Sequence, residues 1–236
     1  MSAPATYARV AGVLFLVSIV AGGFGEGIAP SQLIVSGDAA ATAHNVIASD
    51  ALFRAGFAGY LVEGMCDAAL TVILYVLLRP VDRTLALFGV VFRILATATF
   101  AFAELFYFVP SLLVGNDAYL SSFTAAQRDA LVLLAFNVYG VGGAMSLAFY
   151  GAGSMFLGYL MYRSTYVPRV IGALWVLGGL CFVARTFTVV LVPAYSPAVL
   201  QAPMVLAILI LAAWWLIRGV DATKWEARAG PVRDAA

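Results

Sequence analysis

Residues 84–112 read TLALFGVVFRILATATFAFAELFYFVPSL, and only two side chains in this stretch, Arg93 and Glu104, carry a charge. About 20 consecutive apolar residues are enough for an α-helix to cross the hydrocarbon core of a bilayer, whereas buried helices of soluble proteins show shorter apolar runs. The stretch therefore predicts a transmembrane helix that holds two charged groups.

Comparable apolar runs occur at five other places, residues 8–29, 54–79, 131–162, 170–192 and 202–219. Of the 236 residues, 64% are hydrophobic and 11% are charged, against about a quarter charged in an ordinary soluble domain. So few charges cannot cover a water-exposed surface. We predict an all-α fold, a polytopic membrane bundle of about six transmembrane helices that forms a single domain over residues 1–236, with the first run retained as a helix rather than removed as a signal peptide.

The positively charged side chains predict the orientation. In a six-span arrangement most of them fall on one side, at Arg9, Arg79, Arg83, Arg163, Arg169, Arg218, Lys224, Arg228 and Arg233. Cytoplasmic loops carry the excess of Lys and Arg, so we predict that both termini are cytoplasmic. Residues 30–53 and 113–130 then lie outside, and within the first of these, residues 37–53 form either a short helix at the outer surface or a solvated loop.

Three stretches together resemble a known family. They are ARVAG at Ala8–Gly12, ILYVLLRPVDRTLALFGVVFRI at Ile73–Ile94 and YGAGSMFLGYLMYRSTYVPRVIG at Tyr150–Gly172. In this order they are similar to an uncharacterised bacterial integral-membrane family, domain of unknown function 4386. The resemblance implies about six helices and a multi-pass protein of the bacterial plasma membrane, and it implies no activity.

Charged side chains inside the apolar runs need an explanation, because each costs at least about 2.5 kcal/mol at the centre of a bilayer. Four are acids and two are arginines: Glu26, Glu63, Asp67, Arg93, Glu104 and Arg185. Asp67 and Arg93 fall near the middle of their runs, which predicts an ion pair. The other four fall nearer the outer ends, which predicts a second, outer group.

The outer group has two interpretations. The charges either fix the register of the helices, or they line an outward-facing polar pocket that holds a proton, a cation or the amine of a small ligand. In the two groups together, four acids face two arginines and leave a net negative charge, so we expect an acid to be protonated or a cation or ligand to be bound. The function classes that follow are a protein binding a small molecule, lipid or cation (including a transporter), an assembly or regulatory subunit with structural charges, and an intramembrane enzyme using a metal or cofactor.

Other features add little chemistry. His44, the only histidine, is a candidate outer-loop ligand, and zinc or haem at His44 are hypotheses based on residue type alone. Cys66 and Cys181 lie inside apolar runs without a second ligand at metal spacing, so we interpret them as inert thiols. No nucleotide-binding motif is present, and a net charge of +1 gives no reason to expect a nucleic-acid partner.

The fourth run contains small residues at intervals of four, Gly140, Ala144, Ala148 and Ala152. Small residues at this spacing allow the backbones of two helices to approach closely. The ladder therefore predicts a packing face, either against another helix of the chain or against a second copy in a homo-oligomer.

Overall fold

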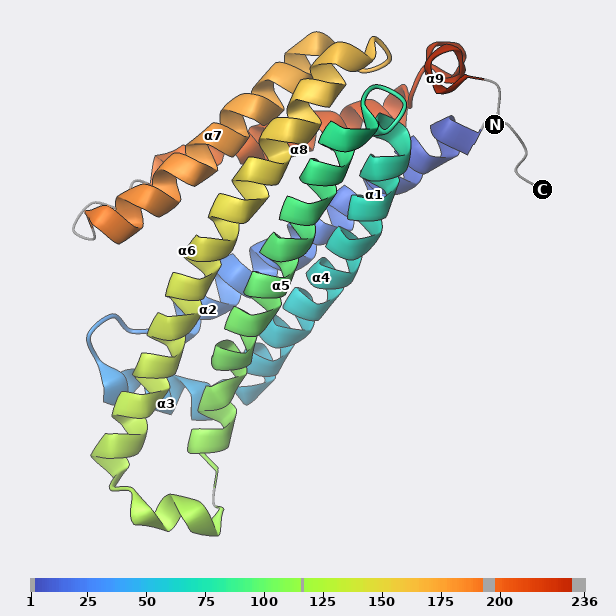
Figure 1. Ribbon diagram of the computed structural model, residues 1–236. Helices are drawn as coiled ribbons and strands as arrows, with labels where there is room; N and C mark the ends of the chain where they lie inside the picture. The colour runs from blue at the N-terminus through green and yellow to red at the C-terminus, as the bar shows by residue number, and fades with distance from the viewer. Residues whose placement is uncertain (1–2, 116, 193–197, 231–236) are drawn as a thin grey trace. The chain divides into compact units, whose positions relative to one another are not determined.

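The computed structural model describes residues 3–115, 117–192 and 198–230, and this part of the chain is helical with no strand (Figure 1). The elements in order are α1 (Ala3–Gly22), the π-helix η1 (Gly23–Ile28), α2 (Ala29–Leu33), α3 (Ala39–Ala48), α4 (Asp50–Leu78), α5 (Arg83–Leu113), the 3₁₀-helix η2 (Ala118–Ser122), α6 (Ala125–Ser164), α7 (Arg169–Leu191), the 3₁₀-helix η3 (Ala198–Gln201), α8 (Ala202–Ile217) and α9 (Ala222–Ala229).

Six helices of the described chain are long and apolar enough to cross a membrane. They run over Ala3–Leu33, Asp50–Leu78, Arg83–Leu113, Ala125–Ser164, Arg169–Leu191 and Val199–Ile217. The predicted all-α fold with six spans is confirmed, and each predicted run lies within or close to one of these segments. The chain is accordingly a multi-pass membrane protein.

Residues 37–53, for which the sequence allowed either a short helix or a solvated loop, contain the helix α3. Asp38 begins it, because its carboxylate accepts a hydrogen bond from the backbone N–H of Ala41 at 2.9 Å. A side chain that satisfies a free N–H in the first turn stabilises a helix at this end. The buried face of α3 carries Ala43 and Val46, which belong to an aromatic core with Phe53.

The chain forms two compact units. Unit 1 contains residues Met1–Leu16, Cys66–Thr97 and Met145–Ala236, and unit 2 contains Val17–Met65 and Ala98–Ala144. The helices α1, α4, α5 and α6 contribute to both. The predicted central pair, Asp67 and Arg93, therefore belongs to unit 1, whereas Glu63 and Glu104 belong to unit 2.

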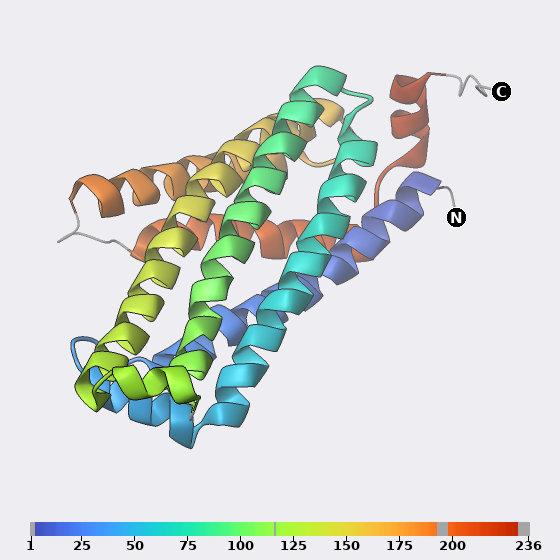
Figure 2. The ribbon, with the colours of Figure 1, turned by 60° about the horizontal axis from the view of Figure 1, so that its bottom comes forward.

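In unit 1 the core is built around two fully buried tryptophans, Trp175 and Trp215. The ring of Phe15 meets that of Trp175 edge-on at 5.8 Å, and the Trp175 Nε1–H donates a hydrogen bond to the carbonyl of Ala207 at 3.2 Å. This bond joins α7 to α8, which lie beside each other (Figure 2). Indole rings thus fill the interior while the one polar atom of Trp175 is satisfied.

In unit 2 the first span contains a π-helical turn, Gly23–Ile28, followed by Pro30. Proline has no backbone N–H, so Pro30 cannot make the regular helical bond to the carbonyl of Glu26 four residues earlier. The backbone N–H of Ala29 instead bonds to the carbonyl of Phe24, in the five-residue spacing of a π-helix. Such turns are often found at functional sites, and this one carries Glu26.

Candidate functional site

The predicted central pair forms within unit 1. The Arg93 Nη2 donates to Asp67 Oδ1 at 3.0 Å, and the side chain of Arg93 is fully buried while that of Asp67 is 17% exposed. The Arg93 Nε donates to the Thr71 hydroxyl at 3.1 Å, and this hydroxyl donates to the Asp67 carbonyl at 2.8 Å. Because Asp67 and Thr71 are one turn apart on α4, both face the same guanidinium of α5.

The third helix around Arg93 is α6. The guanidinium carbon of Arg93 lies 4.6 Å from the centre of the Tyr150 ring, a cation–π arrangement. One turn after Tyr150 on α6, a Cβ added to Gly153 would lie 3.0 Å from the carbonyl oxygen of Gly89 and 3.3 Å from Cγ of Arg93. Only glycine at this position lets α6 approach α5 this closely. Arg93 therefore connects α4, α5 and α6, which favours a structural role for this pair.

The outer acids of unit 2 come from three elements. Glu26 lies on η1, Glu63 on α4 and Glu104 on α5. Access to them differs, since Glu26 is exposed, Glu63 is partly buried and Glu104 is only 6% exposed. Glu26 and Glu104 are close enough to interact electrostatically. The Glu63 carboxylate lies against the backbone of Gly22, where an added Cβ would be 2.5 Å from Oε2.

Beside these acids, three buried tyrosines form a hydroxyl-bearing cluster, Tyr60, Tyr107 and Tyr139. Their ring centres are 5.1 Å apart for Tyr60–Tyr107, 5.7 Å for Tyr60–Tyr139 and 5.4 Å for Tyr107–Tyr139. The hydroxyls of Tyr60 and Tyr139 hydrogen-bond to each other, and that of Tyr107 donates to the Phe53 carbonyl at 3.3 Å. A layer of aromatic faces and hydroxyls thus lies inside apolar spans.

Two of the acids, Glu26 and Glu104, lie within electrostatic range of the tyrosines. Glu26 interacts electrostatically with both Tyr60 and Tyr139, and Glu104 interacts with Tyr139. None of these three tyrosines was predicted from the sequence as a site residue. Their spacing gives no signal, because Tyr60, Tyr107 and Tyr139 lie on three different helices and meet only through the lateral packing of α4, α5 and α6.

The other two candidates are Arg185 and His44. Arg185 is on α7 and belongs to unit 1, so its predicted association with the outer acids stays a prediction. His44 is exposed on α3. Within residues 3–115, 117–192 and 198–230, no group of three His, Cys, Asp or Glu side chains is placed to hold a metal ion, so the described geometry gives no support to the zinc hypothesis at His44.

The small-residue ladder on α6 is divided between the units. Gly140 is exposed, and a Cβ added there would meet no described atom within 4 Å. The close approaches of α6 within the units use other glycines: a Cβ on Gly142 would lie 2.5 Å from that of Ala103, and one on Gly158 would lie 2.8 Å from that of Trp175. The predicted role of the ladder in a homo-oligomer stays a prediction.

With this geometry described, comparison with known proteins adds one finding. The family model "Domain of unknown function (DUF4386)" matches residues 10–219, which is most of the chain. The chain belongs to this family. The resemblance seen in the three sequence stretches is therefore confirmed. The comparison with curated proteins found no match, and neither did the comparison with solved structures. Membership of DUF4386 brings no activity with it, so a function for this DUF4386 protein has to be argued from its sites.

Proposed function

We propose that this protein binds a small organic cation, an amine or a quaternary ammonium group, at the acids and tyrosines of unit 2. The observation that carries the proposal is Glu104, an acid only 6% exposed on an apolar span, whose electrostatic neighbour Glu26 is a second acid. Two carboxylates that interact in a low-dielectric environment disfavour each other's charge. A bound cation relieves both the repulsion and the cost of burial.

The surroundings suit an organic cation. The rings of Tyr60, Tyr107 and Tyr139 carry negative potential on their faces, and Phe100 meets Tyr60 edge-on at 5.8 Å. An ammonium group held by a carboxylate and an aromatic face gains from both interactions, and the cation–π part reaches about 2 kcal/mol when water is excluded. Metal ions instead need several oxygen or nitrogen ligands brought together, an arrangement that the described acids do not make.

The order of exposure supports an entry route. Glu26 is exposed, Glu63 is partly buried and Glu104 is buried, so carboxylates extend from the surface of unit 2 into its interior. The π-helical turn that carries Glu26 lacks the regular four-residue hydrogen bonds and is the irregular part of the first span. A transporter for organic cations is one form that this binding activity could take.

The test is a thermal-shift titration of the detergent-solubilised protein with tetramethylammonium, choline and a primary alkylamine, with sodium as the reference ion. A ligand at about 100 times its Kd stabilises the folded state by about 2.7 kcal/mol. We expect one of the organic cations to stabilise the wild type and Glu226→Gln, whose exposed acid lies on α9, and to leave Glu104→Gln unshifted. A shift of equal size in Glu104→Gln, or no shift with any organic cation, contradicts the proposal.

A second candidate function is an assembly subunit. It is favoured by the open surface at Gly140, where α6 has no described neighbour within 4 Å of an added Cβ. The exposed surface around Gly140 then meets a second copy of the chain. A cysteine placed at Gly140 should form a disulfide-linked dimer in membranes, whereas one at Leu134, which is also exposed on α6, should not. Equal cross-linking at both positions, or none at either, counts against assembly through this face.

We propose further that the protein resides in the bacterial plasma membrane with both termini cytoplasmic. The support is the concentration of arginine at one end of the spans, including Arg79 and Arg83 in one turn and Arg163 and Arg169 in another. A reporter enzyme that is active only outside the cytoplasm should be inactive when fused after residue 236 and active when inserted in residues 113–124. The opposite pattern would reverse the orientation.

A further inference from the structure

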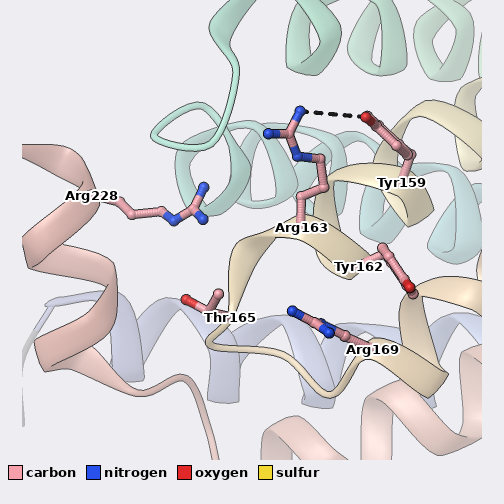
Figure 3. A pocket seen from close by; sticks show the side chains of 6 residues that line it. All are labelled: Tyr159, Tyr162, Arg163, Thr165, Arg169 and Arg228. Carbon is pink, nitrogen blue, oxygen red and sulfur yellow. Dashed lines mark hydrogen bonds between the residues drawn. The ribbon is translucent and has the colours of Figure 1, made fainter.

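A pocket of about 400 Å³ lies at the turn between α6 and α7, entirely within unit 1 (Figure 3). Three of its lining residues are arginines and two are tyrosines: Arg163, Arg169, Arg228, Tyr159 and Tyr162, together with Thr165. The three guanidinium groups lie around the turn that carries Thr165. None of these residues is among the acids and tyrosines of unit 2, so the pocket does not depend on the cation-binding proposal.

The charge of the pocket is not neutralised by the described part of the chain. Within residues 3–115, 117–192 and 198–230, no carboxylate lies within 4.0 Å of a nitrogen of Arg163, Arg169 or Arg228, since the ion pairs there involve other residues. The two tyrosines hold the arginines in place by weaker contacts. Arg163 lies 5.8 Å from the Tyr159 ring centre, and Arg169 lies 5.8 Å from that of Tyr162.

The backbone adds to the positive potential. Arg169 is the first residue of α7, a helix of 23 residues preceded by Pro168. The first N–H groups of a helix have no partner within it, and the aligned peptide dipoles place partial positive charge at this end. An anion in the pocket therefore meets three guanidinium groups and lies near a helix N-terminus, the combination that binds phosphate in many proteins.

The pocket is preformed by two hydrogen bonds to one carbonyl. The Tyr166 hydroxyl donates to the carbonyl of Leu77 at 2.5 Å, and the Trp225 indole N–H donates to the same oxygen at 3.0 Å. The first bond fixes the α6–α7 turn against the end of α4, and the second fixes α9, which brings Arg228 to the pocket. Thr165 has a φ of 67°, a left-handed conformation that a β-branched residue rarely adopts, so the turn holds a strained shape.

We propose that this pocket binds a phosphate group. Guanidinium groups match phosphate oxygens through paired, charge-assisted hydrogen bonds, and tyrosine hydroxyls add neutral donors. The phosphate comes either from the headgroup of an anionic phospholipid or from a small soluble phosphate compound. The predicted orientation places the pocket at the cytoplasmic end of the spans, where anionic lipid headgroups meet basic pockets between helices.

The experiment uses the full chain in nanodiscs and has two arms. The first arm measures by native mass spectrometry how much phosphatidylglycerol the protein retains over phosphatidylcholine. The second titrates inorganic phosphate and glycerol 3-phosphate into protein in pure phosphatidylcholine nanodiscs. Both arms compare the wild type with Arg169→Gln and Arg228→Gln, and with Arg218→Gln as a matched control, because Arg218 is exposed on the same side and does not line the pocket.

Loss of one guanidinium should weaken phosphate binding at least about tenfold, which corresponds to about 1.4 kcal/mol, because a hydrogen bond to a charged group contributes at least this much. Retention of phosphatidylglycerol that falls in Arg169→Gln and Arg228→Gln but not in Arg218→Gln supports a lipid headgroup. Saturable binding of the soluble phosphates with the same dependence on the variants supports a soluble ligand. Arg228 lies on the exposed surface of α9, so its variant should fold even if Arg169→Gln does not. Equal binding by all four proteins, or no binding in either arm, overturns the proposal.

Discussion

Removing the charge of Asp67 should lower the free energy of unfolding by several kcal/mol, because this carboxylate is the ion-pair partner of the buried Arg93. Asp67→Asn keeps the shape of the side chain and removes its charge, which leaves a guanidinium with a fully buried side chain and no described carboxylate within 4.0 Å. Removing one partner of a buried ion pair costs about 3–5 kcal/mol. The 17% exposure of Asp67 and the retained Thr71 and Tyr150 contacts place the expected loss near the lower end, at about 3 kcal/mol.

The assay is unfolding of the solubilised protein by added sodium dodecyl sulfate, followed by the fluorescence of the tryptophans, two of which, Trp175 and Trp215, are fully buried. Asp50→Asn is the matched control, because its partner Arg54 and Asp50 itself are both more than half exposed, and an exposed pair contributes at most about 1 kcal/mol.

Replacing the pair by apolar residues, Asp67→Leu with Arg93→Met, should recover most of the loss, since no unpaired charge remains buried. Two results would refute the reasoning. One is an Asp67→Asn protein as stable as Asp50→Asn. The other is a double variant less stable than Asp67→Asn.

Three further predictions concern packing, the tyrosine layer and α9. Gly172→Ala should destabilise the protein by about 1–3 kcal/mol, because the added methyl group meets the backbone of α6. Gly140→Ala should stabilise it by up to about 1 kcal/mol, because the added methyl group meets no described atom and alanine favours a helix. Melting curves of the two variants measure both effects. Tyr139→Phe should cost about 1–3 kcal/mol in the same measurement, because a buried hydroxyl loses its partner, and an unchanged melting curve would contradict this. At α9, the hydrogen bond from the backbone N–H of Lys224 lowers the pKa of Asp221 from its ordinary value of 3.8. The stabilisation by this carboxylate is therefore complete above pH 3.8 and is lost as the pH falls through the lower folded-state pKa. The protection of the α9 amides, measured against their intrinsic exchange rates, should fall only there, and Asp221→Ala, which removes the helix cap, should lower this protection at neutral pH.

The spans could be predicted because apolar length is a property of each segment by itself. The pairing of Asp67 with Arg93 was also accessible, since both fall near the middle of neighbouring antiparallel spans. Thr71 could have been added from its position one turn after Asp67. Tyr150 could not, because a sequence without a contact map does not show which face of α6 meets α5.

The surroundings of the outer acids were even less predictable, because they too depend on which helix faces meet. Counting residues placed Glu26, Glu63 and Glu104 at similar depths, and the structure places all three in unit 2. The π-helical turn under Glu26 and the cluster of Tyr60, Tyr107 and Tyr139 had no periodic signature. The cluster arises from the lateral packing of α4, α5 and α6, and the π-helical turn directly precedes Pro30, which lacks a backbone N–H; hydropathy encodes neither feature.

The most direct test of cation binding in unit 2 is native mass spectrometry of the protein released gently from its own membrane. The wild type and Glu226→Gln should each carry a stoichiometric adduct with the mass of an organic cation, and Glu104→Gln should be bare, because the buried carboxylate at residue 104 holds the charge of the ligand. Bare protein in all three samples, or an adduct that persists in Glu104→Gln, would contradict the account.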